Sequence, residues 1–278
     1  MSERHHSLRW IAAIGFVVAA LLAIPIIVVV SMFVFRDNPG ARSLEDALEA
    51  FRSGDSSAID SIGAVVTRPP AGVYLADATG KASISFPPSN QNYGATAPVT
   101  VTHRGDACWT TTVDFTTAFQ QRWDYCIQDG VLTEHGNYTK TDWDLGAATI
   151  SNRSEFLCSP PGALITPGER RNDVSTYTCS GTSDAIEGTT TSAVTFESLG
   201  TSTLNIGGAD IATFHYRERD ELTGPQRGTT VIDYWYAVSD MLLLRMERHI
   251  DLRTDSPVGD VTYQEDGEWQ LSSLTPSR

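Results

Sequence analysis

Four cysteines carry the most definite chemistry in this chain of 278 residues, and their spacing limits what that chemistry can be. Cys108 and Cys126 stand 18 positions apart, and Cys158 and Cys179 stand 21 apart. Zinc sites and thiol-exchange centres commonly use a CxxC pair, which the sequence lacks. Outside the cytoplasm thiols oxidise, so two sequential disulfides, 108–126 and 158–179, are predicted from the three possible connectivities.

The first pair of cysteines also fixes a strand register. If Cys108 and Cys126 close an antiparallel hairpin, Trp109 faces Tyr125, and Phe115 faces Phe119 across a turn at 116–118. That register separates the two faces by chemistry. One face holds Trp109, Val113, Phe115, Phe119, Trp123 and Tyr125, and the other holds the cysteines with Thr110, Thr112, Asp114, Gln120, Arg122 and Asp124.

Catalytic and metal motifs are otherwise missing from the sequence. HExxH, GxSxG and a P-loop are absent, and the histidines at 103, 135, 215 and 249 share no motif. Asp142, Asp144 and Gly146 resemble part of a calcium loop without its last acidic ligand, and we interpret them as an acidic turn. We therefore predict no catalytic residue, metal or cofactor, while a Ser/His/Asp site assembled only in three dimensions stays open as a third, hydrolase alternative.

Aromatic residues in candidate strands are the remaining feature with a functional interpretation. They either fill a core or line a pocket for an apolar ligand. The pocket interpretation selects Trp109, Phe115, Trp123, Tyr125, Tyr234 and Tyr236 as candidate lining residues. Tyr234 and Tyr236 share one face of a strand, and Trp235 points to the other.

The N-terminal segment predicts where these residues are held. Residues 11–35 are uncharged, which is long enough for a helix to cross a bilayer, and we predict a span over 10–35. Arg4 and Arg9 precede it, so residues 1–9 are expected in the cytoplasm and the remainder outside. A cleaved signal peptide, with Val29 and Ser31 as its small residues, is the alternative.

Charge excludes one class of partner. The chain has a net charge of −14, and without Glu3, Arg4 and Arg9 the part after residue 35 has 33 acidic and 18 basic residues. Such a surface repels nucleic acid and anionic lipid headgroups.

The segments after the span predict a linker and one β domain. Residues 36–67 form the linker. A short helix is predicted over 43–53, because Ser43 and Asp46 resemble a capping box at its start. Residues 68–276 form the extracytoplasmic domain, with strands predicted over 72–78, 97–103, 190–199 and 230–238. Hairpins are predicted over 202–219 around Gly207 and Gly208, over 233–250, and over 259–274 with a turn at Asp266 and Gly267.

A series of segments carries a family resemblance: GVYLADATG, PVTVTH, CWTTTVDF, RWDYC, FLC, YTC, LNIGGADIATFHYRE, RGTTVIDYWYAVSDMLLLRMER and VTYQEDGEWQLSSLTP. Over residues 68–276 the chain resembles an uncharacterised group of actinobacterial membrane-anchored or secreted β-rich proteins. Its later part also resembles the half-barrel of bacterial lipoprotein carriers and mycobacterial lipid-carrier lipoproteins. That resemblance implies an architecture and supplies no catalytic residue.

Together these observations predict a mainly β protein with an N-terminal transmembrane helix, a short juxtamembrane helix, and an antiparallel meandering sheet or half-barrel. It is expected in the cell membrane as a single-pass protein with the C-terminal domain outside. We expect it to bind a lipid or other apolar envelope molecule without catalysis. A structural role, or docking to another envelope protein, is the alternative.

Overall fold

A computed structural model describes residues 39–54, 67–146, 148–166, 170–256 and 259–278 of the chain. The predicted cytoplasmic tail and the predicted span over 10–35 lie outside these residues. Within the described ranges, no helix is both long and apolar enough to cross a bilayer.

One helix and thirteen strands make up the described structure. The helix is α2 (Leu44–Ser53). The first seven strands are β1 (Gly72–Ser85), β2 (Pro88–Asn92), β3 (Thr96–Arg104), β4 (Cys108–Thr116), β5 (Phe119–Gln128), β6 (Val131–Asp144) and β7 (Thr149–Ile165). The last six are β8 (Val174–Ser183), β9 (Ile186–Ile206), β10 (Ala209–Thr223), β11 (Gln226–Ala237), β12 (Leu243–Thr254) and β13 (Val261–Leu271).

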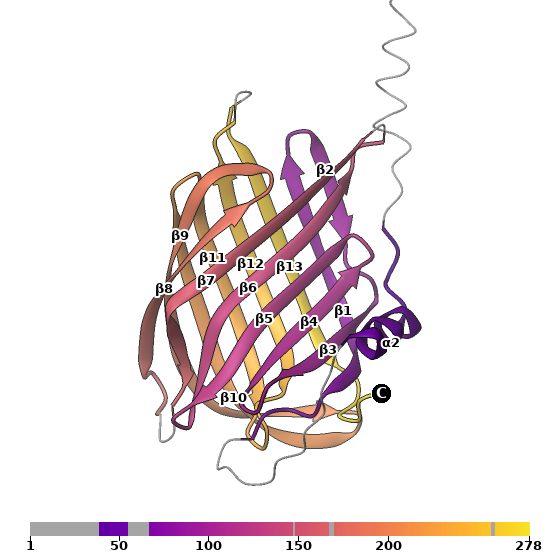
Figure 1. The fold of residues 1–278 in the computed structure, drawn as a ribbon, viewed down its shortest axis with the longest axis vertical. Helices are drawn as coiled ribbons and strands as arrows, with labels where there is room; N and C mark the ends of the chain where they lie inside the picture. Colours follow the sequence, from indigo (N-terminus) through magenta and orange to yellow (C-terminus); the bar gives the residue numbers. More distant parts are fainter. Residues whose placement is uncertain (1–38, 55–66, 147, 167–169, 257–258) are drawn as a thin grey trace, which may run out of the picture. The chain divides into compact units, whose positions relative to one another are not determined.

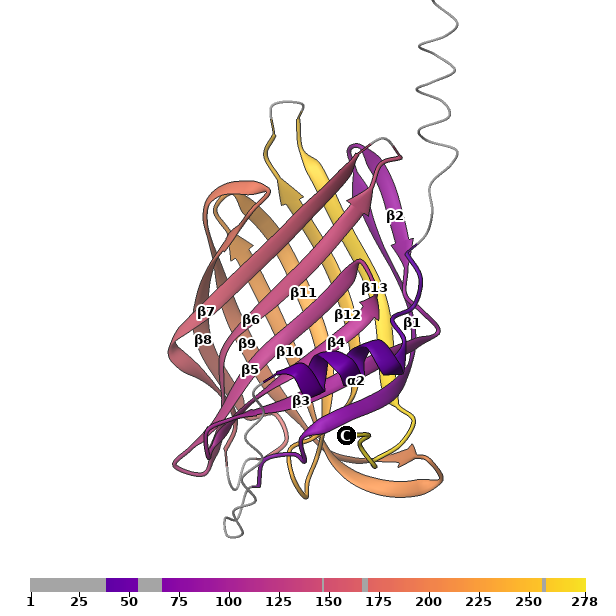
Figure 2. The same cartoon turned by 45° about the vertical axis from the view of Figure 1, so that its right-hand side comes forward.

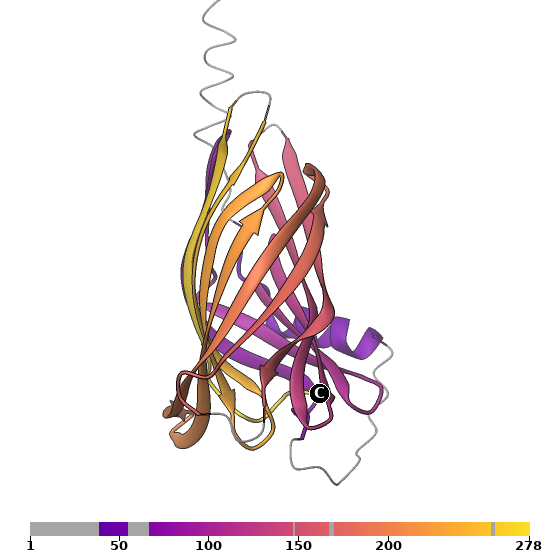
Figure 3. The same cartoon turned by 90° about the vertical axis from the view of Figure 1, so that its left-hand side faces the viewer.

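The strands close into a barrel. Each strand from β3 to β13 lies beside its neighbour in sequence, and β13 also pairs with β1, so twelve of the thirteen strands form a ring and β2 pairs only with β1 (Figures 1 and 3). The barrel is therefore closed, whereas the sequence predicted a meandering sheet or a half-barrel. Closure pairs Ala76–Ile84 with Tyr263–Leu271, and it leaves neither β1 nor β13 as a free edge.

Alternation along the strands separates an inner from an outer face. On β11, Tyr234 and Tyr236 are buried in the main core, whereas Trp235 stacks on His215 of β10 on the opposite face, as the sequence predicts. The outer face carries ion pairs, among them Arg219 with Glu197. The part of the inner face that holds the main core is therefore apolar and aromatic, and the outer face is charged.

The apolar core occupies one part of the interior. It is a single cluster drawn from β1, β3–β5, β9–β13 and the ends of β6 and β7. Two smaller clusters lie apart from it. One is formed by Cys158, Cys179 and Val194, and the other by Leu222, Ile250 and Leu252.

The cysteine-ended hairpin has the predicted register over most of its length. Cys108 pairs with Cys126 and Trp109 with Tyr125, and both predicted disulfides, 108–126 and 158–179, are formed. The predicted pairing of Phe115 with Phe119 is wrong, because the register shifts between Asp114 and Thr116 and places Thr116 opposite Phe119. The extra residue is Phe115, which remains fully buried.

Two other hairpin predictions have opposite outcomes. The hairpin around Gly207 and Gly208 forms between β9 and β10, and both glycines have positive φ, at 58° and 88°, as a tight turn requires. The predicted turn at Asp266 and Gly267 is wrong, because both residues lie inside the continuous strand β13. Gly267 is needed there for close approach, since a Cβ would collide with the ring of Tyr93.

The predicted helix forms as α2, against the outside of β1 and β3 (Figure 2). Ser43 caps it by accepting a hydrogen bond from the Asp46 N–H at 3.0 Å. The preceding segment is fixed to the barrel, because Arg42 Nη1 donates to the buried Asp114 Oδ1 at 2.9 Å.

The chain divides into two compact units. The larger unit, 38–142 and 151–278, contains α2 and nearly all of the strands. The described residues of the smaller unit are 143–146 and 148–150, where the Leu145 N–H donates to the Ala148 carbonyl at 2.9 Å.

Candidate functional site

The six aromatic residues predicted to line a ligand site come together inside the barrel. Trp109, Phe115, Trp123, Tyr125, Tyr234 and Tyr236 are each at most 4% exposed and belong to the same buried cluster. We call them the aromatic set. The Tyr125 and Tyr236 hydroxyls lie 3.2 Å apart, and the rings of Tyr234 and Tyr236 stack with centroids 5.9 Å apart. Their role as ligand lining stays a prediction.

Beside the aromatic set lies a layer of carboxyl and phenol groups that the sequence reasoning missed. It consists of Glu134 on β6, Tyr177 on β8, Glu218 and Asp220 on β10, and Tyr234 on β11; we call it the acid–tyrosine layer. Glu134 and Glu218 are only 3% and 6% exposed. The signal was present in YRERDEL, where Glu218 and Asp220 share a strand face with Tyr216 and Leu222, both buried.

Hydrogen bonds connect the acid–tyrosine layer across four strands. Glu134 accepts from Asn137 Nδ2 at 3.1 Å and from the Tyr177 hydroxyl at 3.0 Å. The same Tyr177 hydroxyl lies 3.5 Å from Glu218, and the Tyr234 hydroxyl donates to Glu218 at 3.4 Å. Asp220 Oδ1 is buried and has no hydrogen-bond partner among the described residues.

Burial raises the pKa of every acidic group in the layer. Desolvation raises the pKa of Glu134 and Glu218, and Asp220 and Glu134 raise that of Glu218 further by like-charge repulsion. Desolvation and the charge of Glu134 raise the pKa of Asp220 to about 8. The pKa of Tyr177 rises well above its usual range for the same reasons. Near neutral pH Asp220 therefore holds a proton that an exposed carboxyl would have lost.

A second buried polar cluster on the inner face is electrically balanced. The Arg248 guanidinium on β12 pairs with Glu265 on β13 at 3.1 Å, with side chains only 3% and 0% exposed. Tyr93 and Tyr263 donate to the two oxygens of Glu265, and Arg248 donates to Gln121. Desolvation alone would lower the pKa of Arg248, but the neighbouring carboxylate raises it. This cluster stabilises the wall and has no unmatched charge.

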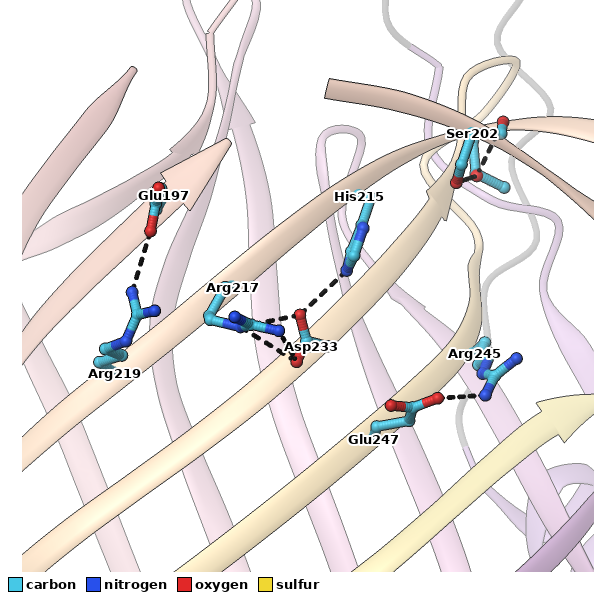
Figure 4. Close-up of polar contacts among 9 residues, drawn as sticks. Glu197, Ser202, His215, Arg217, Arg219, Asp233, Arg245 and Glu247 are labelled. Carbon is cyan, nitrogen blue, oxygen red and sulfur yellow. Dashed lines mark hydrogen bonds and ion pairs between the residues drawn. The ribbon is translucent and has the colours of Figure 1, made fainter. Parts of the chain in front are cut away.

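On the outer face, a histidine and an acid form a pair that an arginine also contacts. His215 Nε2 lies 2.9 Å from Asp233 Oδ1, and Arg217 holds the same carboxylate through both oxygens (Figure 4). Desolvation raises the pKa of Asp233, but hydrogen bonds from His215 and Arg217 outweigh it, and the net shift is downward.

This pair does not extend to a nucleophile. The His215 ring stacks on Trp235 at 4.2 Å, and the Arg245 guanidinium lies 5.0 Å from the Trp235 centroid on the same face. Ser202 bonds Thr213 at 2.8 Å and does not contact the histidine (Figure 4). No serine, threonine or cysteine of the described residues hydrogen-bonds His215, so the arrangement is a charged surface ladder and lacks the triad geometry.

An open hollow of about 510 Å³ lies beside this ladder, on β1 and β11–β13. Its wall includes Asp233, Glu247, His249 and Asp266. These groups pair with one another or with arginines, as His249 does with Asp266 and Arg245 with Glu247. In the described part of the chain no three His, Cys, Asp or Glu side chains are placed to hold a metal ion. In the acidic turn, Asp144 accepts a hydrogen bond from the Gly146 N–H at 2.7 Å.

Comparisons with known proteins find similarity among solved structures. No protein-family model and no curated protein matches the chain. Among solved structures, the chain is similar to the hypothetical lipoprotein YmcC from Escherichia coli K12, with a TM-score of 0.34 and 14% identity over 72% of this chain and 85% of that one. No function is transferred from this similarity. The actinobacterial family resemblance is untested and stays a prediction.

Proposed function

We propose that the barrel is a non-catalytic binding domain for an apolar envelope molecule, held inside the ring against the aromatic set. The observation that carries the proposal is the closed ring with an aromatic inner face and a charged outer face. Such a ring would keep an apolar ligand in its interior away from water. The two disulfides agree with a location outside the cytoplasm, and we propose tethering by the N-terminal span.

The number of strands supports room for a ligand. Eight strands enclose an interior that side chains just fill, and diameter grows roughly in proportion to strand number. A ring of twelve strands therefore has roughly 1.5 times that diameter and about 2.2 times the cross-section, while the inward side chains in each layer increase only about 1.5-fold. Side chains alone fill a smaller share of such an interior.

The size of the inward side chains varies along the barrel. On β9 the buried residues run from Phe196, in the main core, through Val194 and Ser192 to Thr190. Thr230 on β11 is also small and buried. We therefore place the ligand over the aromatic set and the acid–tyrosine layer, with these small side chains as its wall.

The test is to detect a bound ligand and then to block its site with a larger side chain. Full-length protein, extracted from its own host in mild detergent and examined by native mass spectrometry, should carry an additional lipid-sized mass. Ser192→Trp adds bulk on the inner face and should remove that mass, whereas Ala193→Trp, on the exposed outer face of the same strand, should retain it. An unliganded mass for the unaltered protein would count against the proposal and favour a structural or partner-docking role.

A further inference from the structure

We propose that the acid–tyrosine layer binds the protonated amine of an amphiphile whose apolar body lies in the barrel interior. The inference rests on the proposed function, because it names the class of ligand that the interior selects. It has three independent supports: the number of hydrogen-bond donors, the balance of charge, and the apolar surfaces next to the layer.

The donors inside the layer are too few for its acceptors. Glu134 and Glu218 have four oxygens, and they receive hydrogen bonds from Asn137, Tyr177 and Tyr234. Tyr177 has one proton for two carboxyls, and it lies nearer to Glu134 (3.0 Å) than to Glu218 (3.5 Å). Glu218 Oε2 therefore has only the longer of the two contacts with this shared hydroxyl, at 3.5 Å.

Two further inward oxygens also lack partners. Asp220 Oδ1 is buried without a hydrogen bond, and so is Ser192 Oγ, in a side chain whose residue is only 5% exposed. Ser192 pairs with Leu222 on β10, two positions beyond Asp220 and on the same inner face. Buried polar atoms without partners are rare in folded proteins, and each calls for an explanation such as a bound ligand. An ammonium group brings three donors to this part of the wall.

The layer also has no cation to pair with the charge that it carries when its carboxyls ionise. Glu134, Glu218 and Asp220 form no ion pair with any lysine, arginine or histidine in the described ranges, whereas Glu265 on the same inner face has Arg248. The groups that face the three acids are Tyr125 on β5, Tyr177 on β8, and Tyr234 and Tyr236 on β11. Asp124 also acts on Glu134, but it is itself paired with Arg122 at 3.3 Å. A carboxylate or phosphate headgroup would be repelled here, while a cation would supply the missing opposite charge.

Apolar surfaces lie on both sides of the layer. On one side Phe196 and Tyr216 stack with ring centroids 4.8 Å apart, and on the other lies the small cluster of Leu222, Ile250 and Leu252. A small amine without a hydrocarbon body, or an inorganic cation, would make no contact with these apolar groups. A molecule with an ammonium head and a hydrocarbon body matches both the polar layer and the apolar groups beside it.

Binding should release a proton. Burial raises the pKa of Asp220 to about 8, so the free protein holds protons on the layer near neutral pH. An ammonium group stabilises the ionised carboxyl and lowers that pKa. Uptake of one amine should therefore displace up to about one proton into the buffer.

The experiment compares three probes with the same chain length on full-length protein in one detergent: octylamine, 1-octanol and octanoate. By isothermal titration, octylamine should bind at least about tenfold more tightly than the other two, a difference of about 1.4 kcal/mol. Its enthalpy should change between phosphate and Tris buffers, as proton release requires. Glu218→Gln should weaken octylamine about tenfold and change octanol less than twofold, which shows that the barrel remains folded.

The matched control is Glu197→Gln, on the outer face and paired with Arg219, which should leave all three affinities unchanged. If octanol or octanoate binds as well as octylamine, the inference is overturned while the proposed function stands. The same holds if Glu218→Gln leaves the preference for octylamine intact. If none of the three probes binds, the proposed function fails, and the inference fails with it.

Discussion

Replacing Arg248 with methionine should lower the free energy of unfolding of the barrel by about 3–5 kcal/mol. The Arg248–Glu265 pair is 3.1 Å apart with both side chains buried, so the change leaves a carboxylate in the interior without its cation. At an effective dielectric constant of about 20, two charges at that distance interact by about 5 kcal/mol. Tyr93 and Tyr263 still donate to Glu265, which places the expected loss within the stated range.

The measurement is urea unfolding of the full-length protein in mild detergent, followed by tryptophan fluorescence. Arg248→Met, Glu265→Gln and the double variant complete a double-mutant cycle, which should give a coupling energy of about 2 kcal/mol or more. Arg219→Met, with its matched partner change at Glu197, is the exposed control, and that pair should couple by about 1 kcal/mol or less. A coupling energy for the buried pair no larger than the exposed one would refute the reasoning.

Three other predictions follow from the described contacts. Replacing Cys108 and Cys126 together by serine should cost about 3 kcal/mol of stability in urea unfolding, because the disulfide closes a loop with a separation of 18, and thiol labelling of the unaltered native protein should find no free cysteine. The pKa of Asp220 is raised to about 8, so the folded state holds this proton more tightly than the unfolded state does. The free energy of unfolding should therefore fall as the pH rises from about 4 to 8, and Asp220→Asn should reduce that fall in thermal unfolding. Gly267→Ala should cost about 1–3 kcal/mol, because its methyl group meets the ring of Tyr93, and an unchanged melting temperature would contradict this.

Local features of the fold could be predicted from the sequence because they depend on neighbouring residues. The hairpin between Cys108 and Cys126 is fixed by its end residues and by the alternation between them, and only the shift at Asp114–Thr116 was missed. The tight turn at Gly207 and Gly208 is likewise encoded by residues that tolerate positive φ. Trp235 was assigned to the correct face because alternation is a local rule.

Closure of the ring depends on residues far apart in the chain, so the sequence could not predict it. Gly80 pairs with Gly267, and the ring of Tyr93 packs over both positions, where a Cβ on either glycine would collide with it. From the sequence alone, Gly267 after Asp266 is indistinguishable from a hairpin turn. Only the strand that arrives from the other end of the chain shows that the glycine makes room for an aromatic ring.

The acid–tyrosine layer could not be predicted for a related reason. Glu134, Tyr177 and Glu218 lie on three different strands, and each strand on its own shows a charged or polar residue of the kind that usually faces water. Whether such a residue faces water depends on which face of the ring it occupies. The sequence does show which residues share a strand face, because side chains alternate. Glu218 lies on the face of Tyr216, and Arg217 and Arg219 lie on the other.

The alternation of faces along β10 bears on which ligand the barrel interior selects. The two arginines that could neutralise the carboxyls on β10 instead pair outside, Arg217 with Asp233 and Arg219 with Glu197. Alternation therefore puts both arginines of this strand outside, together with Glu221, and puts Glu218 and Asp220 inside. A barrel that held only hydrocarbon would gain nothing from buried carboxyls that lack a cation, and would be more stable with apolar residues at Glu218 and Asp220. The interior charge is best explained as the part of the site that a cationic ligand completes.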